Sequence, residues 1–403
     1  MGTSRHRRRT ICVVTGSRAD YGHITSLLEA VREDADLKLQ LVATGSHLEP
    51  QFGLTWREIE RDGFTIDRKV KILRDDNTDV GVTKAFGFGC QKFADVFSEL
   101  KPDIVVLLGD RYEIFAACVA AYFQRIPIAH IHGGETTEGA FDEGIRHSIS
   151  KMSTVHFASA DAYAKRIVQL GESPRRVFPF GAPGLDNIRR ADLLDRAALA
   201  AELGLELTAP VGMVTYHPVT LENADAAGQV KELLTALERS QLTLIFTKAN
   251  ADPQGMKINA ALKKFCAAHP QRAKLFDNLG QRRYYSFLKI ADVMIGNSSS
   301  GLLEAPVFRL PVVNIGDRQR SRIRGTNVID VECRAAAITT GIRKALSPAF
   351  RRSLKRQANP YDRAGGRVGQ RIKDQLKRLP LTDDVLKKKF FDMPVPSGRN
   401  GRS

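Results

Sequence analysis

A strand-like apolar run in the first half of the chain ends in a group of charged residues with the types that acid–base chemistry needs. The segment 109–113 reads Gly-Asp-Arg-Tyr-Glu and directly follows the apolar run 104–108. A carboxylate such as Asp110 can act as an acid or a base there if desolvation raises its pKa. The alternative is a surface turn, in which Asp110 and Arg111 pair with each other and cap the next helix.

Histidines and carboxylates gather again a few residues further on. The segment 130–135 reads His-Ile-His-Gly-Gly-Glu, and 141–147 reads Phe-Asp-Glu-Gly-Ile-Arg-His. His130 and His132 share one face of a strand, which is directed at a ligand or at the core. A metal site built from these two histidines and Glu135 is an alternative, but no HExxH or comparable ligand spacing supports it. We therefore predict catalytic side chains here and no metal.

The first apolar run of the chain, 11–15, leads into a motif suited to an anion. The segment 15–22 reads Thr-Gly-Ser-Arg-Ala-Asp-Tyr-Gly, so a tight turn precedes a predicted helix N-terminus. Arg18 can hold a phosphate with two hydrogen bonds. Otherwise Asp20 is only a helix cap and Arg18 a surface charge. The segment matches neither GxGxxG nor the P-loop, so it supports neither a dinucleotide site nor a Walker-type site.

Three motifs in the second half also follow apolar runs. The segment 216–220 reads Tyr-His-Pro-Val-Thr, in which proline stiffens the turn beside His217. The segment 296–301, Gly-Asn-Ser-Ser-Ser-Gly, offers hydroxyls and free N–H groups at a helix start, which suits a diphosphate. Glu304 follows one turn later and is placed to accept hydrogen bonds from a ribose. The segment 316–320, Gly-Asp-Arg-Gln-Arg, adds positive charge. The alternatives are a core histidine and a serine-rich cap.

The elements that must position these motifs alternate between strands and helices. Short runs rich in Val, Ile and Leu predict strands at 11–15, 39–44, 104–108, 127–131, 155–158, 211–216, 242–247, 275–276, 293–295 and 312–315. Helical periodicity predicts helices at 20–32, 80–100, 114–123, 221–239, 253–268, 282–289, 301–308 and 335–346. This alternation indicates an α/β protein with two parallel sheets covered on both faces. Ligands of such sheets bind at the carboxyl ends of the strands, so we expect the motifs to line a cleft between two facing domains.

The sequence divides into two similar units flanked by basic ends. We predict a basic extension at 1–9, an N-terminal Rossmann-like domain at 10–182 and a C-terminal one at 183–361. The pattern pauses around 177–190, where Phe-Gly-Ala-Pro-Gly at 180–184 indicates a linker. A helix at 362–380 is expected to pack back across the domains, and 381–403 is expected to be a mobile basic tail.

The net charge of +16 lies at the two ends of the chain. The first ten residues carry four arginines and no acid, and the sequence from 341 onward carries 17 Lys or Arg against 5 Asp or Glu. The remaining middle is neutral, which disfavours a specific nucleic-acid partner, although a non-catalytic polyanion-binding protein stays an alternative. We find no bilayer-spanning run and no signal peptide, and the five scattered cysteines suit reduced thiols. We therefore expect a cytoplasmic protein without a membrane partner.

Taken together, the motifs resemble the UDP-N-acetylglucosamine 2-epimerase family, and more narrowly its hydrolysing branch of sialic or legionaminic acid biosynthesis. The resemblance covers about residues 10–365 and rests on the segments 17–21, 109–111, 132–135, 142–147, 217–220, 296–304 and 316–319. Non-hydrolysing epimerases of the family typically read His-Val-Glu-Ala-Gly-Leu-Arg where this chain has 130–135. The resemblance implies two Rossmann-like domains facing across a cleft, the GT-B fold, and a cofactor-free reaction of a nucleotide sugar, most simply a UDP sugar. It also implies a homodimer or homotetramer.

The implied reaction is loss of the nucleotide from sugar C1 and of the proton from C2, followed by addition of water with inversion at C2. By this resemblance, the catalytic candidates are Asp110, His132 and Asp142. The candidates for substrate and nucleotide binding are Arg18, Asp20, Arg111, Glu135, His217, Ser298, Ser299, Glu304 and Arg318. A glycosyltransferase of the same fold is the alternative, and it would need an acceptor.

One residue departs from the family pattern. Several hydrolysing members carry glutamate before Gly-Gly-Glu, where this chain has His132. A neutral imidazole can act as a base near pH 7. The exchange motivates the hypothesis that the chain acts on a 4-acetamido-6-deoxy sugar, such as UDP-2,4-diacetamido-trideoxyglucose, in place of UDP-N-acetylglucosamine.

Overall fold

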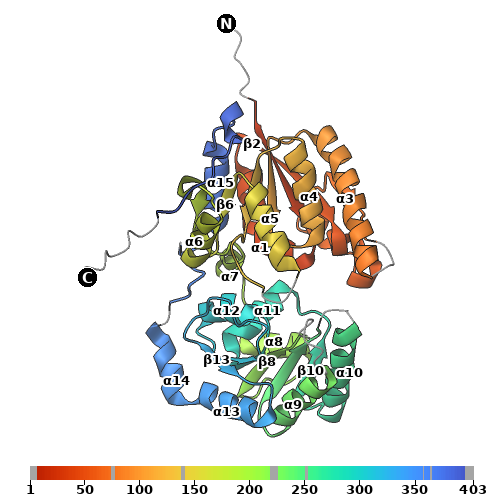
Figure 1. The fold of residues 1–403 in the computed structure, drawn as a ribbon. Helices are drawn as coiled ribbons and strands as arrows, with labels where there is room; N and C mark the ends of the chain where they lie inside the picture. The colour runs from red at the N-terminus through yellow and green to blue at the C-terminus, as the bar shows by residue number, and fades with distance from the viewer. Residues whose placement is uncertain are drawn as a thin grey trace, which may run out of the picture. The chain divides into compact units, whose positions relative to one another are not determined.

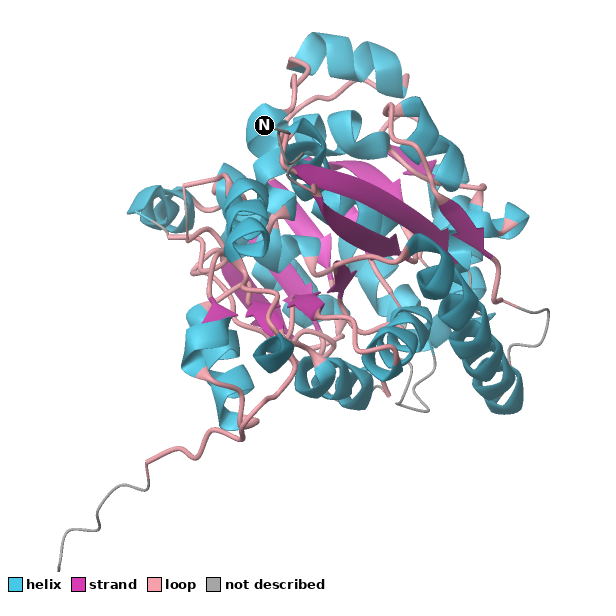
Figure 2. Cartoon of the chain, turned by 90° about the horizontal axis from the view of Figure 1, so that it is seen from above, coloured by secondary structure: helices cyan, strands magenta, loops and turns pink. Residues whose placement is uncertain are grey.

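The structure, a computed structural model, contains two compact units, each built around one parallel sheet (Figures 1 and 2). It describes residues 7–73, 78–137, 141–217, 226–249, 253–356, 358–363 and 365–394. Unit 1 consists of Met1–Glu135, Phe141–Gly184 and Arg363–Ser403, and unit 2 consists of Thr136–Ala140 and Leu185–Asp362. The C-terminal segment of the chain therefore belongs to the first unit.

The sheet of unit 1 has seven parallel strands in the order β3-β2-β1-β4-β5-β6-β7. The strands are β1 (Arg9–Thr15), β2 (Leu37–Thr44), β3 (Arg68–Val70), β4 (Ile104–Leu108), β5 (Ile128–Ile131), β6 (Val155–Phe157) and β7 (Val177–Phe178). The strand order reverses between β1 and β4, and such a switch point is where Rossmann-like sheets bind their ligands. A ligand of this sheet is therefore expected at the loops after these two strands.

Strand β1 shows why the sheet is covered on both faces. Ile11 and Val13 belong to one apolar core, while Cys12 and Val14 belong to the other. Successive side chains of a strand point to opposite faces, so a continuous apolar run supplies both cores at once. The helices of this unit are α1 (Arg18–Glu33), α2 (Trp56–Arg61), α3 (Asp79–Leu100), α4 (Tyr112–Phe123), α5 (Asp142–Met152), α6 (Asp161–Gln169) and α15 (Val368–Arg378).

Unit 2 repeats the same plan with six parallel strands in the order β10-β9-β8-β11-β12-β13. The strands are β8 (Val211–Thr215), β9 (Thr243–Thr247), β10 (Ala273–Phe276), β11 (Val293–Gly296), β12 (Val312–Ile315) and β13 (Val328–Val331). The helices are α7 (Gly184–Arg190), α8 (Arg196–Leu203), α9 (Ala226–Glu238), α10 (Pro253–Ala268), α11 (Gly280–Ile290), α12 (Ser300–Leu303), α13 (Ala335–Leu346) and α14 (Pro348–Ser353). The strand order reverses between β8 and β11, so the loops after these two strands are where a ligand of this sheet is expected.

Some predicted elements differ from the structure for physical reasons. The edge strands β3, β7 and β13 were not predicted, because they are only two to four residues long and two of them carry charged residues. The helix predicted at 301–308 breaks into α12 and a 3₁₀ turn over Ala305–Phe308, because Pro306 has no N–H to donate. The predicted pause at 177–190 contains β7 and α7. The start of the helix predicted at 221–239 lies outside the described residues.

The C-terminal helix α15 packs on α1, so two helices far apart in the sequence lie side by side (Figure 1). Lys373 and Lys377 bind Asp34 of the α1 C-cap at 3.0 and 2.8 Å. Although burial opposes it, these two hydrogen bonds lower the pKa of the Asp34 carboxyl to about 2. Gly369 is needed at this contact, because a Cβ there would lie 2.6 Å from the backbone of Ser26.

The segment after α15 differs from the predicted mobile tail as far as it is described. Lys388 binds the buried carboxylate of Glu172 at 2.6 Å, and the backbone N–H of Phe391 donates to the carbonyl of Gly171 at 2.9 Å. Its basic residues therefore include one that neutralises a buried acid, which a composition argument does not distinguish from a solvated charge. Residues 395–403 lie outside the described part of the chain.

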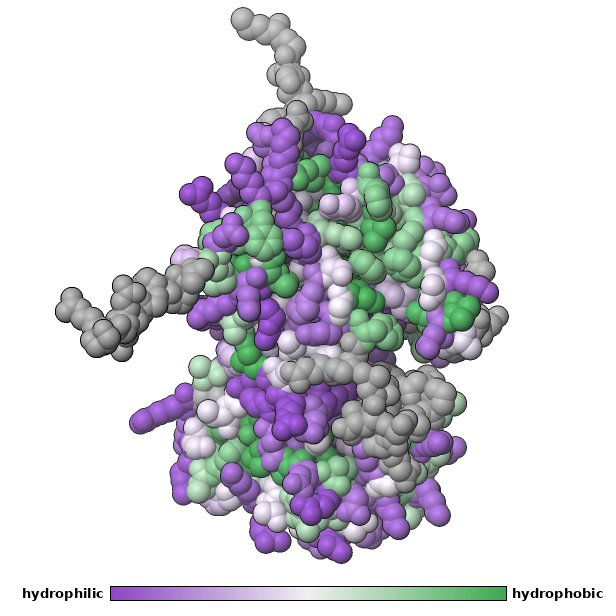
Figure 3. Space-filling model, viewed as in Figure 1, coloured by the Kyte–Doolittle hydropathy of each residue, from purple (hydrophilic) through white to green (hydrophobic). Residues whose placement is uncertain are grey.

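The face of the molecule in Figure 3 alternates hydrophilic regions with hydrophobic ones. Tyr122 and Phe123 at the end of α4 are 51 and 79 % exposed. Among the helices of the described residues, none has the length and apolar character that a membrane crossing requires. All five cysteines are free thiols. The expected self-association stays a prediction.

Candidate active site

In each unit, the predicted site residues gather after the strands that flank the switch point. In unit 1 they follow β1, β4 and β5, and in unit 2 they follow β8, β11 and β12. The carboxyl ends of parallel strands lie at one edge of a sheet, so residues far apart in sequence meet there. Each unit therefore carries its own group of polar side chains.

The loop after β1 places Asp20 against charged residues of the loop after β4. Ser17 caps α1 by accepting a hydrogen bond from the Asp20 N–H at 3.2 Å. The Oδ2 atom of Asp20 is buried and has no hydrogen-bond partner among the described residues. Burial raises the pKa of this carboxyl to about 6; the positive charge of Arg111 opposes the shift, and the charge of Glu113 adds to it. Arg18 instead pairs with Glu58 at 2.7 Å and is about one-third exposed.

A buried arginine of α5 joins two of the predicted acids. Arg146 is 3 % exposed; it forms an ion pair with Asp110, and its Nη1 lies 3.7 Å from Glu135 Oε2. Beside them, Arg111 Nε donates to the fully buried Glu113 carboxylate at 2.5 Å. The site thus holds alternating charges from the loop after β4, from α4 and α5, and from the loop after β5.

The two histidines around β5 have different surroundings. His130 is fully buried, and its ring nitrogens lie 3.1 Å from Ser150 Oγ and 2.8 Å from the Gly109 carbonyl oxygen. Burial lowers its pKa to about 3, so it is a neutral residue of the fold. His132, just beyond the strand, lies with its Nδ1 2.6 Å from Glu135 Oε1.

The loop containing His132 is shaped by the two glycines that follow it. Gly134 has φ +75°, and a Cβ there would lie 2.3 Å from the carbonyl oxygen of Tyr163. Only glycine fits at that distance. The tight turn brings Glu135 back to His132 and to Ser159, whose hydroxyl donates to Glu135 Oε1 at 2.6 Å.

Asp142 begins α5 and has the surroundings of a proton carrier. Burial raises the pKa of its carboxyl to about 6, and the negative charge of Asp110 adds to that shift. The positive charges of Arg111 and Arg146 work in the opposite direction. With a pKa near neutrality, a carboxyl group can both accept and donate a proton at physiological pH.

The group in unit 2 is organised by Asn297. Its side-chain Oδ1 accepts from the His217 N–H at 2.7 Å, and its Nδ2 donates to the His217 carbonyl at 2.8 Å. Its own carbonyl accepts from Arg318 at 3.0 Å and from Gln319 at 2.9 Å. Asn297 therefore ties together the loops after β8, β11 and β12.

Burial shifts the pKa values of His217 and Arg318, the two ionisable side chains of this group that come from the loops after β8 and β12. It lowers the pKa of His217 to about 4 and that of Arg318 to about 10, and a neighbouring positive charge adds to each shift: that of Arg318 on His217, and that of Arg322 on Arg318. His217 is therefore neutral at pH 7, while Arg318 stays a cation. The Nδ1 atom of His217 is buried and has no hydrogen-bond partner among the described residues.

The serine-rich segment after β11 lies close to the first strand of this unit. Gly296 has φ +137°, and a Cβ there would lie 1.9 Å from the Thr215 carbonyl oxygen, so this position requires glycine. Ser298 and Ser299 follow and are only partly buried. Burial raises the pKa of the Glu304 carboxyl one turn later.

Several residues of these two groups were not among the predicted site residues. They are Glu113, Arg146 and Ser159 in unit 1 and Asn297 and Gln319 in unit 2. All but Ser159 lie inside the motifs that drew attention in the sequence. Ser159 follows β6, so its place after a strand is the signal that could have identified it. Within the described residues, no cluster of three or more His, Cys, Asp or Glu side chains could hold a metal ion.

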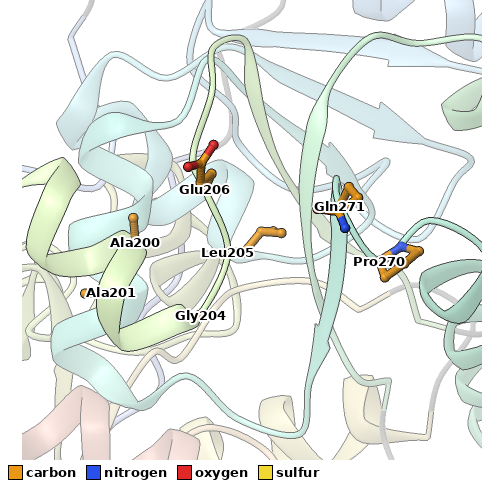
Figure 4. A pocket seen from close by; sticks show the side chains of 7 residues that line it. All are labelled: Ala200, Ala201, Gly204, Leu205, Glu206, Pro270 and Gln271. Carbon is orange, nitrogen blue, oxygen red and sulfur yellow. The ribbon is translucent and has the colours of Figure 1, made fainter.

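A surface hollow of about 420 Å³ in unit 2 is a different feature (Figure 4). It is lined by the end of α8, by Leu205 and Glu206, and by Pro270 and Gln271. These residues precede β8 and β10, so the hollow lies toward the amino ends of the strands. It contains none of the predicted site residues.

Comparison with solved structures defines the fold class. A UDP-GlcNAc 2-epimerase from Neisseria meningitidis, solved bound to UDP-GlcNAc, superposes with a TM-score of 0.79 at 16% identity, covering 92% of this chain and 100% of that one. A putative UDP-N-acetylglucosamine 2-epimerase from Listeria monocytogenes gives 0.78 at 18% identity, covering 92% and 96%. The fold is α/β with two Rossmann-like units, the GT-B class, as predicted.

Sequence comparison gives the family. The profile described as UDP-N-acetylglucosamine 2-epimerase matches residues 29–377, and the chain belongs to this family. A Campylobacter jejuni protein named GDP/UDP-N,N'-diacetylbacillosamine 2-epimerase (hydrolyzing) is 43% identical over 96% of this chain and 100% of its own length. A Legionella pneumophila UDP-N,N'-diacetylbacillosamine 2-epimerase (hydrolyzing) is 36% identical over 94% and 98%. An Escherichia coli polysialic acid biosynthesis protein P7 is 37% identical over 96% and 98%.

These matches confirm the predicted hydrolysing branch. The chain is an enzyme of the hydrolysing 2-epimerase type, so the family decides against the glycosyltransferase alternative. The roles of individual side chains stay predictions.

Proposed function

We propose that the substrate is UDP-N,N'-diacetylbacillosamine, which is the UDP-2,4-diacetamido-trideoxyglucose of the sequence-based hypothesis. The enzyme would convert it with water into UDP and the free 2-epimeric sugar. Two of the relatives carry this sugar in their names, and one of them aligns along its entire length. The exchange at His132, which stands where several hydrolysing members carry glutamate, motivates the same choice.

In this proposal, the group in unit 2 binds the nucleotide. Arg318 supplies a cation that stays charged at pH 7, and Ser298 and Ser299 supply hydroxyl donors for the diphosphate. His217 is neutral, so its imidazole can hydrogen-bond a phosphate oxygen without a net charge. Glu304 is the candidate acceptor for the ribose hydroxyls.

The group in unit 1 carries out the chemistry on the sugar ring. Breaking the C1–O bond leaves oxocarbenium-like positive charge, which the carboxylate of Asp110 stabilises. The proton on C2 is acidified by that charge, and a base then removes it to give the 2-acetamidoglucal. Asp142 can change its protonation state near neutral pH, because its pKa is about 6.

Inversion at C2 requires two proton carriers, since the proton leaves one face of the ring and another returns to the opposite face. His132 and Asp142 are the two carriers in this proposal. Water then adds across the double bond of the glucal, with its hydroxyl on C1 and a proton on C2. Arg18, Asp20 and Arg111 remain the candidates for contacts to the substrate near this group.

The observation that carries this proposal is the buried group of proton-transferring side chains in unit 1, in which Asp142 titrates near neutrality beside Asp110 and Arg146. The test compares kcat/KM for UDP-N,N'-diacetylbacillosamine, its GDP counterpart and UDP-N-acetylglucosamine. We expect the UDP-linked diacetamido sugar to be preferred. A clear preference for UDP-N-acetylglucosamine would reject the diacetamido sugar as the substrate. A preference for the GDP compound would reject uridine as the nucleoside.

A further inference from the structure

The geometry around the loop after β5 points to a role for Glu135 that differs from substrate binding. We infer that Glu135 is a positioning residue: it fixes the His132 imidazole with the proton on Nδ1, so that Nε2 is the atom that exchanges a proton with sugar C2. This inference rests on the proposed function, and it specifies which atom does the chemistry.

The contact between the two side chains determines the tautomer. An ionised carboxylate only accepts hydrogen bonds, so His132 Nδ1, 2.6 Å from Glu135 Oε1, must carry the proton. The ionised form of Glu135 is favoured by two further groups: the Ser159 hydroxyl donates to the same oxygen at 2.6 Å, and Arg146 lies 3.7 Å from the other. With Nδ1 protonated, Nε2 of the neutral ring keeps its lone pair.

Burial makes this arrangement rigid and leaves one atom unsatisfied. The side chains of His132 and Glu135 are 9 and 3 % exposed, and Ser159 is fully buried. His132 Nε2 is itself buried and has no hydrogen-bond partner among the described residues. A buried nitrogen without a partner costs free energy, which folded proteins accept mainly where the atom has a function. The substrate would supply the missing partner.

The backbone of His132 also adopts an uncommon conformation. Its φ is +64°, in the left-handed region that residues other than glycine seldom adopt. Such strain persists where the surrounding structure enforces it, and it is concentrated at active sites. Here the next residues are Gly133 and Gly134, yet the strained position itself keeps an imidazole.

The charged and titratable groups that face His132 come from three directions. Glu135 lies on its own loop, Arg146 of α5 donates to the His132 carbonyl at 3.4 Å, and the ring of His23 of α1 lies 5.8 Å away between centroids. Arg146 also pairs with Asp110. His132 is thus connected through Arg146 to Asp110, the carboxylate proposed to stabilise positive charge on the sugar ring.

The Nε2 lone pair accepts the proton of C2, and the electron pair of that C–H bond becomes the second bond between C1 and C2. The C1–O bond breaks, and its electron pair leaves with UDP. The protonated imidazole, held by Glu135, then returns its proton to solvent. Asp142 donates a proton to C2 from the other face, and water adds to C1 and gives one of its protons to the Asp142 carboxylate.

A second buried pair in the same unit offers a matched control. His156 Nε2 lies 3.2 Å from Glu172 Oε2, and both side chains are at most 2 % exposed. Glu172 is held by Lys151 and Lys388 and belongs to neither proposed group of site residues. Exchange of Glu172 for glutamine should lower the melting temperature and leave kcat and KM of the folded enzyme unchanged.

The test uses the full chain with Glu135→Gln, Ser159→Ala and His132→Gln, and measures kcat and KM with whichever nucleotide sugar the wild type converts. We expect His132→Gln to lower kcat by about 10²–10⁴-fold. Glu135→Gln should lower kcat by roughly 10–100-fold with KM nearly unchanged, which is the scale of the loss when the hydrogen-bond partner of a metal-bound histidine is removed. Ser159→Ala should have a smaller effect of the same kind. A raised KM with normal kcat in Glu135→Gln would overturn the inference, because Glu135 would then bind substrate.

NMR of the imidazole nitrogens in the ¹⁵N-histidine-labelled wild type tests the tautomer without any substrate. The His132 resonances, assigned from their absence in His132→Gln, should show a protonated Nδ1 and an unprotonated Nε2. A proton on Nε2 in the neutral ring would refute the inference even if the enzyme is a diacetylbacillosamine epimerase. If the wild type prefers another sugar while the tautomer and the kcat loss are as expected, the substrate proposal fails and the inference stands.

Discussion

Exchange of Arg146 for methionine should destabilise unit 1 strongly. The arginine is 3 % exposed and is shared by Asp110 and Glu135, whose side chains are 18 and 3 % exposed. Removing one partner of a buried ion pair costs about 3–5 kcal/mol, because the remaining charge stays buried without compensation. Here two carboxylates lose the same cation, so we expect a loss of at least about 3 kcal/mol. That is a large share of the roughly 5–15 kcal/mol that stabilises a typical domain.

The assay is urea unfolding followed by tryptophan fluorescence. The chain has a single tryptophan, Trp56 in α2, so the signal reports on unit 1 alone. The loss should also depend on pH. Burial raises the pKa of Asp142 from 3.8 to about 6, so between about pH 4 and pH 6 the folded state binds a proton that the unfolded state releases, and stability declines as pH rises. Arg146 lowers that pKa, so in its absence the decline in stability continues to higher pH. The variant should therefore lose more unfolding free energy, relative to the wild type, at about pH 7.5 than at about pH 5.5.

The control is Arg68→Met, which removes an exposed ion pair with Glu99. Water screens the charges of an exposed ion pair, so this variant should unfold nearly as the wild type does. A variant with both Arg146→Met and Asp110→Asn should recover part of the loss, since one of the stranded charges is removed. If Arg146→Met and Arg68→Met unfold at the same urea concentration, the claim that Arg146 joins two buried acids is wrong.

Three further predictions concern chemistry, binding and the C-terminal segment. Asp142→Asn should lower kcat by about 10²–10⁴-fold while UDP affinity, measured by calorimetry, stays the same; normal turnover would remove its role as a proton carrier. Exchange of both Ser298 and Arg318 for alanine should weaken UDP binding by at least about tenfold, because charge-assisted hydrogen bonds are lost, and an unchanged affinity would reject the diphosphate assignment. Lys388→Met should lower the unfolding free energy by roughly 1–3 kcal/mol, and with it the melting temperature, because the lysine holds the carboxylate of Glu172. The variant should keep its kcat. An unchanged melting temperature would show that the segment contributes nothing to stability.

The sequence predicted the strands that form the centres of both sheets, because each is a continuous run of apolar residues buried on both faces. It did not predict edge strands such as β3, Arg68–Val70, whose stability comes from pairing with β2 and not from its own composition. It also missed that residues 381–394 pack on unit 1. Lys388 reads as one more basic residue of a charged end, and only the fold reveals the buried acid that it binds.

For the candidate site, the sequence identified the loops, because polar residues directly after apolar strands are hard to place in a core. It could not assign partners within them. His130 and His132 are equivalent in an alternating strand pattern. In the structure, both ring nitrogens of His130 have partners, Ser150 and a backbone carbonyl, whereas Nε2 of His132 has none among the described residues. The ion pairs of Arg146 depend on the packing of α5 against the strand ends, which no local pattern specifies.

The most direct test of the central claim is the conversion of UDP-N,N'-diacetylbacillosamine in deuterated water, without any acceptor, followed by proton NMR. The account predicts that UDP is released together with a free sugar that carries one solvent deuterium at C2 and the inverted configuration there. Release of a sugar that keeps its C2 proton and its original configuration would show simple hydrolysis and would contradict the account.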